Sequence, residues 1–396
     1  MIRLRHASMG AVRHFDFLDE ADRARLFFRV PEPFDVHAAP RLLATALGAT
    51  LYCPATRPKL ADDLSRRAAE GVTSMVVCLE DSIPDDALIE GERNAIAQLR
   101  QFASSGSHGP LVFVRVRSPE QIPMIVAGLG SDEGVLTGFV LPKFTDSNGA
   151  AYLHALAEAS TDVDRALLAM PVMESPEIGD AETRVQTLAA VRRLLDQFRP
   201  HVLAVRIGAT DLSGQYGLRR SREHTVYDVA LLAAVIGDVV NALGRDDGGY
   251  PITGPVWEYF SSSERIFKPQ LRESPFIRHD ERKLRAQLIA RDLDGLIREV
   301  SLDRANGLIG KSVIHPSHVA AVNALSVVSH EEYLDAVDIL GTSAGGGVAS
   351  SAYGNKMNES KPHSAWARRT ELRSRAFGVA HEDVSFVDLL GASLNQ

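Results

Sequence analysis

Two acidic residues, each at the end of an apolar run, offer the clearest chemistry in this chain. Glu174 follows LLAMPVM (167–173), and Asp211 follows VLAVRIGAT (202–210). Residues 181–198 between them have helical character, so the segment predicts strand, helix, strand. Strands joined in this way run parallel and lie side by side or nearly so, and α/β folds place ligands where such strands end. Two carboxylates there suit Mg²⁺, which takes one or two carboxylates and keeps sites for water and substrate.

Either acid alone could instead cap the helix that follows it, because side chains of this kind accept hydrogen bonds from a helix N-terminus. Two acids at matching strand ends, with an arginine-bearing strand nearby, favour a metal pair over two independent caps.

Charged residues also end the second and third apolar runs. Glu80 and Asp81 close SMVVCLED (74–81), and the third run, LVFVRVR, carries Arg115 and Arg117. Side chains alternate along a strand, so the two arginines are expected to share one face. Buried arginine needs a partner, and the two acids are the natural ones. The pair is either a structural salt bridge or a guanidinium held toward a substrate carboxylate or a developing enolate.

Lys143 and His315 are weaker candidates. Lys143 follows the fourth run, and a Schiff-base lysine must be desolvated or lie near another cation. Surrounding carboxylates would keep it charged, so we expect a minor electrostatic contribution. His315 precedes a proline at the end of the eighth run, where a hydrogen-bonded turn residue is as consistent as a base or ligand.

Eight apolar runs of strand length alternate with amphipathic stretches from residue 49 onward. They are 49–55, 74–81, 111–117, 138–144, 167–175, 202–212, 251–258 and 307–316. Continuous apolar runs that alternate with helices indicate parallel strands buried on both faces. Eight such units predict an α/β fold of the (β/α)8 TIM-barrel type. A doubly wound open sheet is the alternative, but PATRPKL lacks the glycine-rich first turn that is common there.

The composition is that of a globular protein, with 396 residues, 45% of them hydrophobic, and a net charge of −8. A mildly acidic chain disfavours nucleic acid as a partner. The start of the sequence lacks the apolar stretch of a signal peptide, and no run of about 18 apolar residues predicts a membrane span. We therefore expect a cytoplasmic protein whose two cysteines are buried thiols.

The positions of the eight apolar runs predict three regions: an N-terminal arm and helix (1–48), a catalytic barrel (49–330), and a C-terminal lid and helical extension (331–396). Residues 259–280 lengthen one loop and are expected to cover the active face. Residues 341–365 are rich in Gly and Ser, a composition typical of a flexible linker or tail.

Seven motifs together resemble the citrate lyase β-subunit-like group of the keto-acid aldolase/citrate lyase superfamily. In order they are LYCPATRPKL, CLEDS, FVRVR, LPK, ESP, GATDL and KSVIHP. The resemblance covers about residues 49–365 and implies a TIM barrel with Mg²⁺-dependent carbon–carbon lyase activity. It places the metal ligands at Glu174 and Asp211, the substrate arginine at Arg115, and the acids of the LEDS motif at Glu80 and Asp81. The asparagine usual in the third motif is Arg117 here, a departure that bears on substrate contacts.

The resemblance also implies an assembly. In relatives that cleave acyl-CoA substrates, an aspartate of a C-terminal segment reaches a neighbouring subunit's site, and Glu359 stands at that position in NKMNE. This predicts a homo-oligomer, a trimer or hexamer with lid exchange, in which the glycine-rich segment is the mobile part. Arg57 and Lys59 are candidates for binding a CoA thioester, or they are solvated charges at a helix start.

The expected reaction is aldol- or Claisen-type cleavage of a 2-keto or 3-hydroxy acid, or of its CoA thioester, with Mg²⁺ as Lewis acid. Two alternatives remain open. One is a malate-synthase-like condensation of a 2-keto acid with acetyl-CoA, which needs the same metal and arginine. The other is a non-catalytic ligand-binding barrel, which the substitutions at Arg117 and Glu359 keep open.

Overall fold

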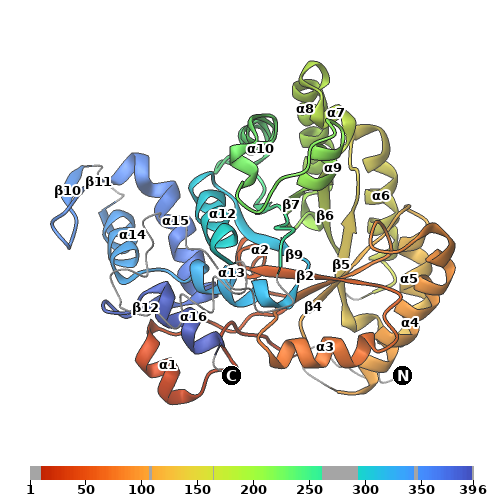
Figure 1. The fold of residues 1–396 in the computed structure, drawn as a ribbon, viewed down its shortest axis with the longest axis horizontal. Helices are drawn as coiled ribbons and strands as arrows, with labels where there is room; N and C mark the ends of the chain where they lie inside the picture. Colours follow the sequence, from red (N-terminus) through yellow and green to blue (C-terminus); the bar gives the residue numbers. More distant parts are fainter. Residues whose placement is uncertain (1–9, 107–108, 164, 261–292, 343–346, 395–396) are drawn as a thin grey trace.

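A closed barrel of eight parallel strands forms the centre of the molecule (Figure 1). The structure, a computed structural model, describes residues 10–106, 109–163, 165–260, 293–342 and 347–394. The predicted TIM barrel is confirmed. Its strands follow one another in sequence order: β2 (Ala49–Pro54), β3 (Ser74–Cys78), β4 (Leu111–Arg115), β5 (Leu136–Leu141), β6 (Leu168–Met173), β7 (Val205–Ile207), β8 (Ile252–Gly254) and β9 (Ile309–Val313).

A helix follows each strand and covers the outside of the barrel. These helices are α3 (Leu60–Ala69), α4 (Leu88–Ser104), α5 (Gln121–Leu129), α6 (Asp146–Ala159), α8 (Ala181–Gln197), α10 (Ala230–Leu243), α12 (Leu293–Ala305) and α13 (Val319–Ser326). Every residue of β3 and β5 is buried, because side chains fill the barrel on one face and helices cover the other. The continuous apolar runs of the sequence reflect this double burial.

The strands end earlier than the apolar runs predict. Strand β7 stops at Ile207, and the short helix α9 (Ala209–Gly214) starts two residues later. Asp211 therefore lies in the first turn of a helix and not on the strand itself. The residues that close each apolar run belong to the turns at the carboxyl end of the barrel, where paired strands give way to loops that carry function.

A buried cluster of charges joins the barrel to α12. Lys311 on β9 has no exposed side-chain surface, and its Nζ lies 2.9 Å from Glu299 Oε1 and 2.6 Å from Asp303 Oδ2. Arg220 contacts Glu299 at 2.5 Å, and the hydroxyl of Tyr227 donates a hydrogen bond to Asp303 (2.9 Å). We call these five residues the wall cluster; its two cations and two carboxylates balance.

The arm and the C-terminal extension pack on each other. The arm holds α1 (Glu20–Leu26), β1 (Phe27–Arg29) and α2 (Pro40–Ala46), and β1 pairs antiparallel with β12 (Val379–Ala380) near the other end of the chain. The buried His14 ring stacks on Phe377, with centroids 4.2 Å apart. The remaining elements of the extension are α14 (His330–Thr342), β10 (Val348–Ser350), β11 (Met357–Glu359), α15 (Ser360–Phe377) and α16 (Phe386–Leu394).

The Gly/Ser-rich segment is not simply a linker. Strands β10 and β11 form an antiparallel hairpin, and α15 begins immediately after it. Residues 261–280, most of the loop expected to cover the active face, lie outside the described residues. Within the described ranges, none of the helices combines the length and apolar character needed to cross a membrane.

Candidate active site

Glu174 and Asp211 lie together at the carboxyl end of the barrel. Glu174 follows β6, and its side chain lies across the end of β7, where a Cβ on Gly208 would fall 2.0 Å from Glu174 Oε2. Only glycine therefore leaves room for this carboxylate. Burial raises the pKa of Glu174 to about 7; Arg115 opposes the rise and the charge of Asp211 adds to it. A carboxylate in this position is costly to ionise and would be stabilised by a further positive charge.

Arg115, the last residue of β4, is held by three carboxylates. Its Nη2 lies 2.9 Å from Glu174 Oε1, 2.7 Å from Glu80 Oε2 and 3.4 Å from Asp81 Oδ2. The predicted contact with the acids that follow β3 is present, and Glu174 joins it. Arg115 Nε is buried without a hydrogen-bond partner. The guanidinium is thus fixed on one side and retains a donor on the other.

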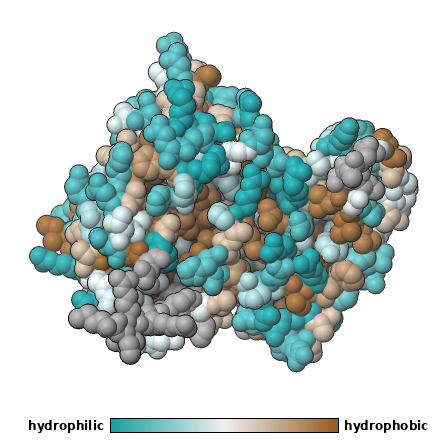
Figure 2. Space-filling view, turned by 180° about the vertical axis from the view of Figure 1, so that it is seen from behind, coloured by the Kyte–Doolittle hydropathy of each residue, from teal (hydrophilic) through white to brown (hydrophobic). Residues whose placement is uncertain are grey.

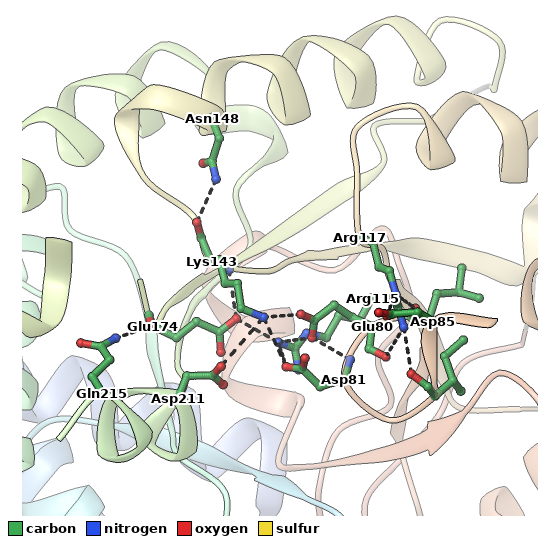
Figure 3. A network of polar contacts seen from close by, with 12 residues as sticks. Glu80, Asp81, Asp85, Arg115, Arg117, Lys143, Asn148, Glu174, Asp211 and Gln215 are labelled. Carbon is green, nitrogen blue, oxygen red and sulfur yellow. Dashed lines mark hydrogen bonds and ion pairs between the residues drawn. The ribbon is translucent and has the colours of Figure 1, made fainter. Parts of the chain in front are cut away.

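Lys143 occupies a more central position than the sequence predicts (Figure 3). Its φ of 46° lies in the left-handed region that L-residues rarely adopt. In this conformation its backbone N–H donates to Glu174 Oε1 (3.0 Å). Its Nζ forms an ion pair with Glu80 and lies 3.5 Å from Asp81 and 3.9 Å from Asp211. Burial lowers the pKa of Lys143, but the contacts with the acids outweigh it and the net shift is upward, so the amine stays charged.

The six residues Glu80, Asp81, Arg115, Lys143, Glu174 and Asp211 form what we call the mouth cluster. Four carboxylates face two cations, which leaves an excess of two negative charges when all four carboxyl groups are ionised. Among the described residues, no group of three or more His, Cys, Asp or Glu side chains is arranged to hold a metal ion unaided. Mg²⁺ needs no such group, because it keeps several waters and uses one or two carboxylates.

A sequence model of the family described as C–C bond lyases of the TIM-barrel fold matches residues 41–379. The chain belongs to this family. It is a carbon–carbon lyase. A comparison with curated proteins by sequence gives no match.

Two solved structures show how widely the fold of this lyase is shared. One is a citrate lyase from Burkholderia xenovorans (TM-score 0.57, 16% identity, 87% of this chain and 96% of that chain). The other is the protein CitE from Mycobacterium tuberculosis in complex with magnesium, acetoacetate and coenzyme A (TM-score 0.51, 18% identity, 85% of this chain and 99% of that chain). At these identities the likeness establishes the fold.

Arg117 lies beside the mouth cluster of the lyase and binds the loop that follows β3. Because β4 ends at Arg115, the expected shared strand face does not extend to Arg117. Its Nε donates to the carbonyl of Leu79 (2.6 Å), its Nη2 donates to that of Ile83 (2.8 Å), and its guanidinium forms an ion pair with Asp85. Arg117 therefore braces the loop that carries the two acids after β3.

The other predicted residues do not join the mouth cluster. Arg57 and Lys59 are exposed beside the end of β2, and Arg57 Nε contacts Asp63 at 2.5 Å. His315 Nδ1 accepts from the N–H of Ser317 (3.3 Å), which is the turn role that the sequence allows. Glu359 is exposed on the β10–β11 hairpin, which contacts α14 and α15 of its own chain at the edge of the molecule (Figure 1).

The sequence analysis did not identify two residues of the site, Gln215 and Arg206. Gln215 Nε2 donates to the carbonyl of Glu174 (3.1 Å), and its position four residues after Asp211 on one helical stretch is a usable signal. Arg206 on β7 is 1% exposed; its Nη2 donates to Ser312 Oγ (2.6 Å), and its guanidinium lies 5.5 Å from the ring centre of Tyr52. Strand alternation alone does not show that Arg206 faces the barrel interior.

Proposed function

We propose that the lyase holds Mg²⁺ with Glu174 and Asp211 and cleaves a carbon–carbon bond in a 2-keto or 3-hydroxy acid, or in its CoA thioester. The observation that carries this proposal is the excess of two negative charges in the mouth cluster, which one divalent cation would neutralise. Hard carboxylate oxygens are the ligands that Mg²⁺ prefers. The presence of magnesium, acetoacetate and coenzyme A in the CitE structure from M. tuberculosis supports the same chemistry.

The positions of the two carboxylates fit such an ion. Glu174 Oε1 is occupied by Arg115 and by the Lys143 N–H, whereas Oε2 lies over Gly208 on the side of β7, the strand that leads to Asp211. The Asp211 side chain is 31% exposed, so it can reach both an ion and its waters. When bound, Mg²⁺ would supply Lewis-acid stabilisation of negative charge on a substrate oxygen.

Arg115 and Lys143 would act on the same negative charge. In the cleavage step a hydroxyl proton passes to a base, the electrons of the breaking carbon–carbon bond move into an enolate fragment, and a carbonyl fragment forms. The Arg115 guanidinium, whose Nη2 is fixed by carboxylates, would donate to a substrate oxygen from its remaining N–H groups. Donors fixed before the reaction stabilise a developing oxyanion at little reorganisation cost.

Glu359 would supply the acid/base from a second copy of the chain. It lies on a hairpin whose residues Val348 and Met357 are 61% and 58% exposed, an apolar surface suited to contact another protein. We therefore infer a homo-oligomer, a trimer or hexamer, in which each hairpin covers the mouth of a neighbouring barrel. Arg57 and Lys59, exposed at the same end of the barrel, would bind the phosphates of a CoA thioester.

Titration calorimetry with Mg²⁺ tests the metal site directly. Glu174→Gln and Asp211→Asn should each abolish Mg²⁺ binding. Glu258→Gln is the matched control, because Glu258 lies at the same end of the barrel and accepts a hydrogen bond from Thr210 (2.6 Å). Unchanged Mg²⁺ affinity in Glu174→Gln would refute the assignment. A screen of keto and hydroxy acids, free and as CoA thioesters, for release of pyruvate or acetyl-CoA would then identify the substrate.

Subunit mixing tests the role of Glu359. Glu174→Gln and Glu359→Gln should each be inactive alone, and a mixture allowed to exchange subunits should regain part of the activity. Recovery requires that one chain supply the metal site and another the hairpin. Two inactive variants that stay inactive after proven exchange would contradict the shared site, without affecting the proposal for Mg²⁺.

A further inference from the structure

A cavity of about 650 Å³ lies at the opposite end of the barrel from the mouth cluster. The residues that enter β8 and β9 line one side, and α2, α12, α13 and α15 line the others. Figure 2 shows the hollow between the barrel and the C-terminal extension. Small-molecule sites commonly have volumes of roughly 300–1,000 Å³, so the space suffices for an organic ligand. Because strands begin here, the cavity is separate from the proposed catalytic end.

Arginines dominate the polar lining of this cavity. Among the described residues, two carboxylates pair with four of them. Glu332 lies 2.6 Å from one arginine and 3.5 Å from another, and Asp246, which also pairs with Arg368 at 2.6 Å, lies 3.6 Å and 3.9 Å from two more. Asp303 also lines the cavity but is already held by Lys311. Five positive charges thus face two negative ones. The lining arginines are Arg41, Arg245, Arg304, Arg369 and Arg373.

Two of these arginines lack a full set of partners. Arg373 Nε is buried without a hydrogen-bond partner, although its Nη2 contacts Glu332. Arg245 donates to the carbonyl and side-chain oxygens of Asn241, and no described carboxylate lies within 4.0 Å of it. A buried guanidinium donor without an acceptor is costly. Both arginines therefore retain capacity for an anion.

Apolar side chains form another part of the lining. Trp366 on α15 is 39% exposed, and Pro251, Leu372 and Phe377 lie among the lining residues. An exposed indole offers a flat surface on which a ring can stack. A simple inorganic anion would leave this part of the cavity unfilled, whereas an anion that carries a ring would use both parts.

We infer that this cavity binds a small phosphorylated organic molecule with two or more negative charges and a planar ring, of which a nucleoside diphosphate is the type. Guanidinium groups match the oxygens of phosphate with paired hydrogen bonds. The bound molecule would join α12 of the barrel to α15, the helix that follows the β10–β11 hairpin. It would thereby fix the extension against the barrel.

Titration calorimetry with ADP, pyrophosphate and adenosine in the presence of EDTA tests the inference. ADP should bind most tightly, pyrophosphate more weakly and adenosine least, because the charges and the ring contribute separately. Arg245→Gln and Arg369→Gln should each weaken ADP binding about tenfold or more, since a hydrogen bond to a charged group contributes on that scale. Trp366→Ala should weaken ADP binding but leave pyrophosphate binding unchanged.

Two controls make the outcome decisive. Arg298→Gln removes an arginine from α12 that pairs with Asp228 and does not line the cavity, and it should leave ADP affinity unchanged. Glu174→Gln should also bind ADP normally, which separates this site from the mouth cluster. The inference is overturned if none of the probes binds at millimolar concentration, if citrate binds in place of the phosphates, or if the arginine variants bind ADP as tightly as the parent protein.

Discussion

The wall cluster and the mouth cluster contain the same kinds of side chain but differ in charge and in exposure. In the wall cluster two cations meet two carboxylates, and the side chains of Lys311 and Glu299 have no exposed surface. In the mouth cluster four carboxylates meet two cations, and Asp81 and Lys143 are about half exposed. In the wall cluster the charges are balanced and buried, and they hold α12 against the barrel. In the mouth cluster the negative charges are in excess and partly exposed, so this cluster can bind a cation and a substrate.

Replacing a lysine in each cluster should show the largest contrast. Lys311→Met leaves two carboxylates buried with fewer partners, and breaking a buried pair in this way costs about 3–5 kcal/mol of unfolding free energy. Lys143→Met, at a site 47% exposed, should cost about 1 kcal/mol or less, as exposed pairs do. Urea unfolding in EDTA measures both. Equal losses would mean that the two clusters do not differ in the way proposed.

A carboxylate-to-amide change should have the same sign in the two clusters and a larger size in the mouth cluster. Because burial raises the pKa of Glu174 from 4.5 to about 7, its contribution to stability is fully present below pH 4.5 and is lost as the pH rises through 7. Glu174→Gln removes the free-energy cost of ionising this buried carboxyl group. It should therefore stabilise the metal-free protein at pH 8 by up to about 3 kcal/mol. Asp303→Asn should stabilise it less, because burial raises the pKa of Asp303 from 3.8 only to about 6 and Lys311 loses a partner. Unfolding curves between pH 4.5 and 8 would show both effects.

Mg²⁺ should stabilise the protein only through the mouth cluster. At a concentration ten to a hundred times its Kd, a ligand adds about 1.4–2.7 kcal/mol to the unfolding free energy. Melting curves with and without Mg²⁺ should show this gain in the parent protein and in Asp303→Asn, but not in Asp211→Asn. A gain that survives in Asp211→Asn would place the cation elsewhere.

Arg117 should have a small effect on stability and a separate effect on turnover. Arg117→Lys keeps the charge but cannot donate to two carbonyls in the same way, so we expect a loss of about 1 kcal/mol in unfolding free energy. The turnover number should fall, because Glu80 and Asp81 would be held less firmly around Arg115. A melting curve beside a steady-state assay measures the two effects. Arg66→Lys is the control, because the Arg66 side chain is 54% exposed and pairs with Asp63 away from the mouth cluster.

The barrel could be predicted from the sequence because each strand is buried on both faces and therefore appears as an apolar run. Glu174, Asp211 and Arg115 could be predicted as neighbours because parallel strands end at one edge. The backbone of Lys143 could not, since a positive φ at a lysine depends on the acceptor that Glu174 provides. The role of Arg117 was also hidden, because strand alternation ends where β4 ends.

The wall cluster could have been predicted in part from the sequence. Glu299 and Asp303 are four residues apart and so lie on one face of a helix, and Lys311 interrupts the apolar run of β9. What the sequence does not reveal is that Lys311 points outward toward that helix. The hairpin of β10 and β11 was hidden for a different reason, because Gly and Ser dominate the segment and mask two three-residue strands.

The pairing of β1 with β12 also has a consequence for biosynthesis. Phe27 pairs with Ala380, so the arm emerges from the ribosome some 350 residues before its partner exists. At synthesis rates of about 5–20 residues per second, that interval lasts roughly 20 to 70 seconds. During it Phe27 lacks its strand partner Ala380, and the ring of His14 lacks Phe377, on which it later stacks. A newly made chain is therefore most open to chaperones, and to association with its neighbours, at its beginning.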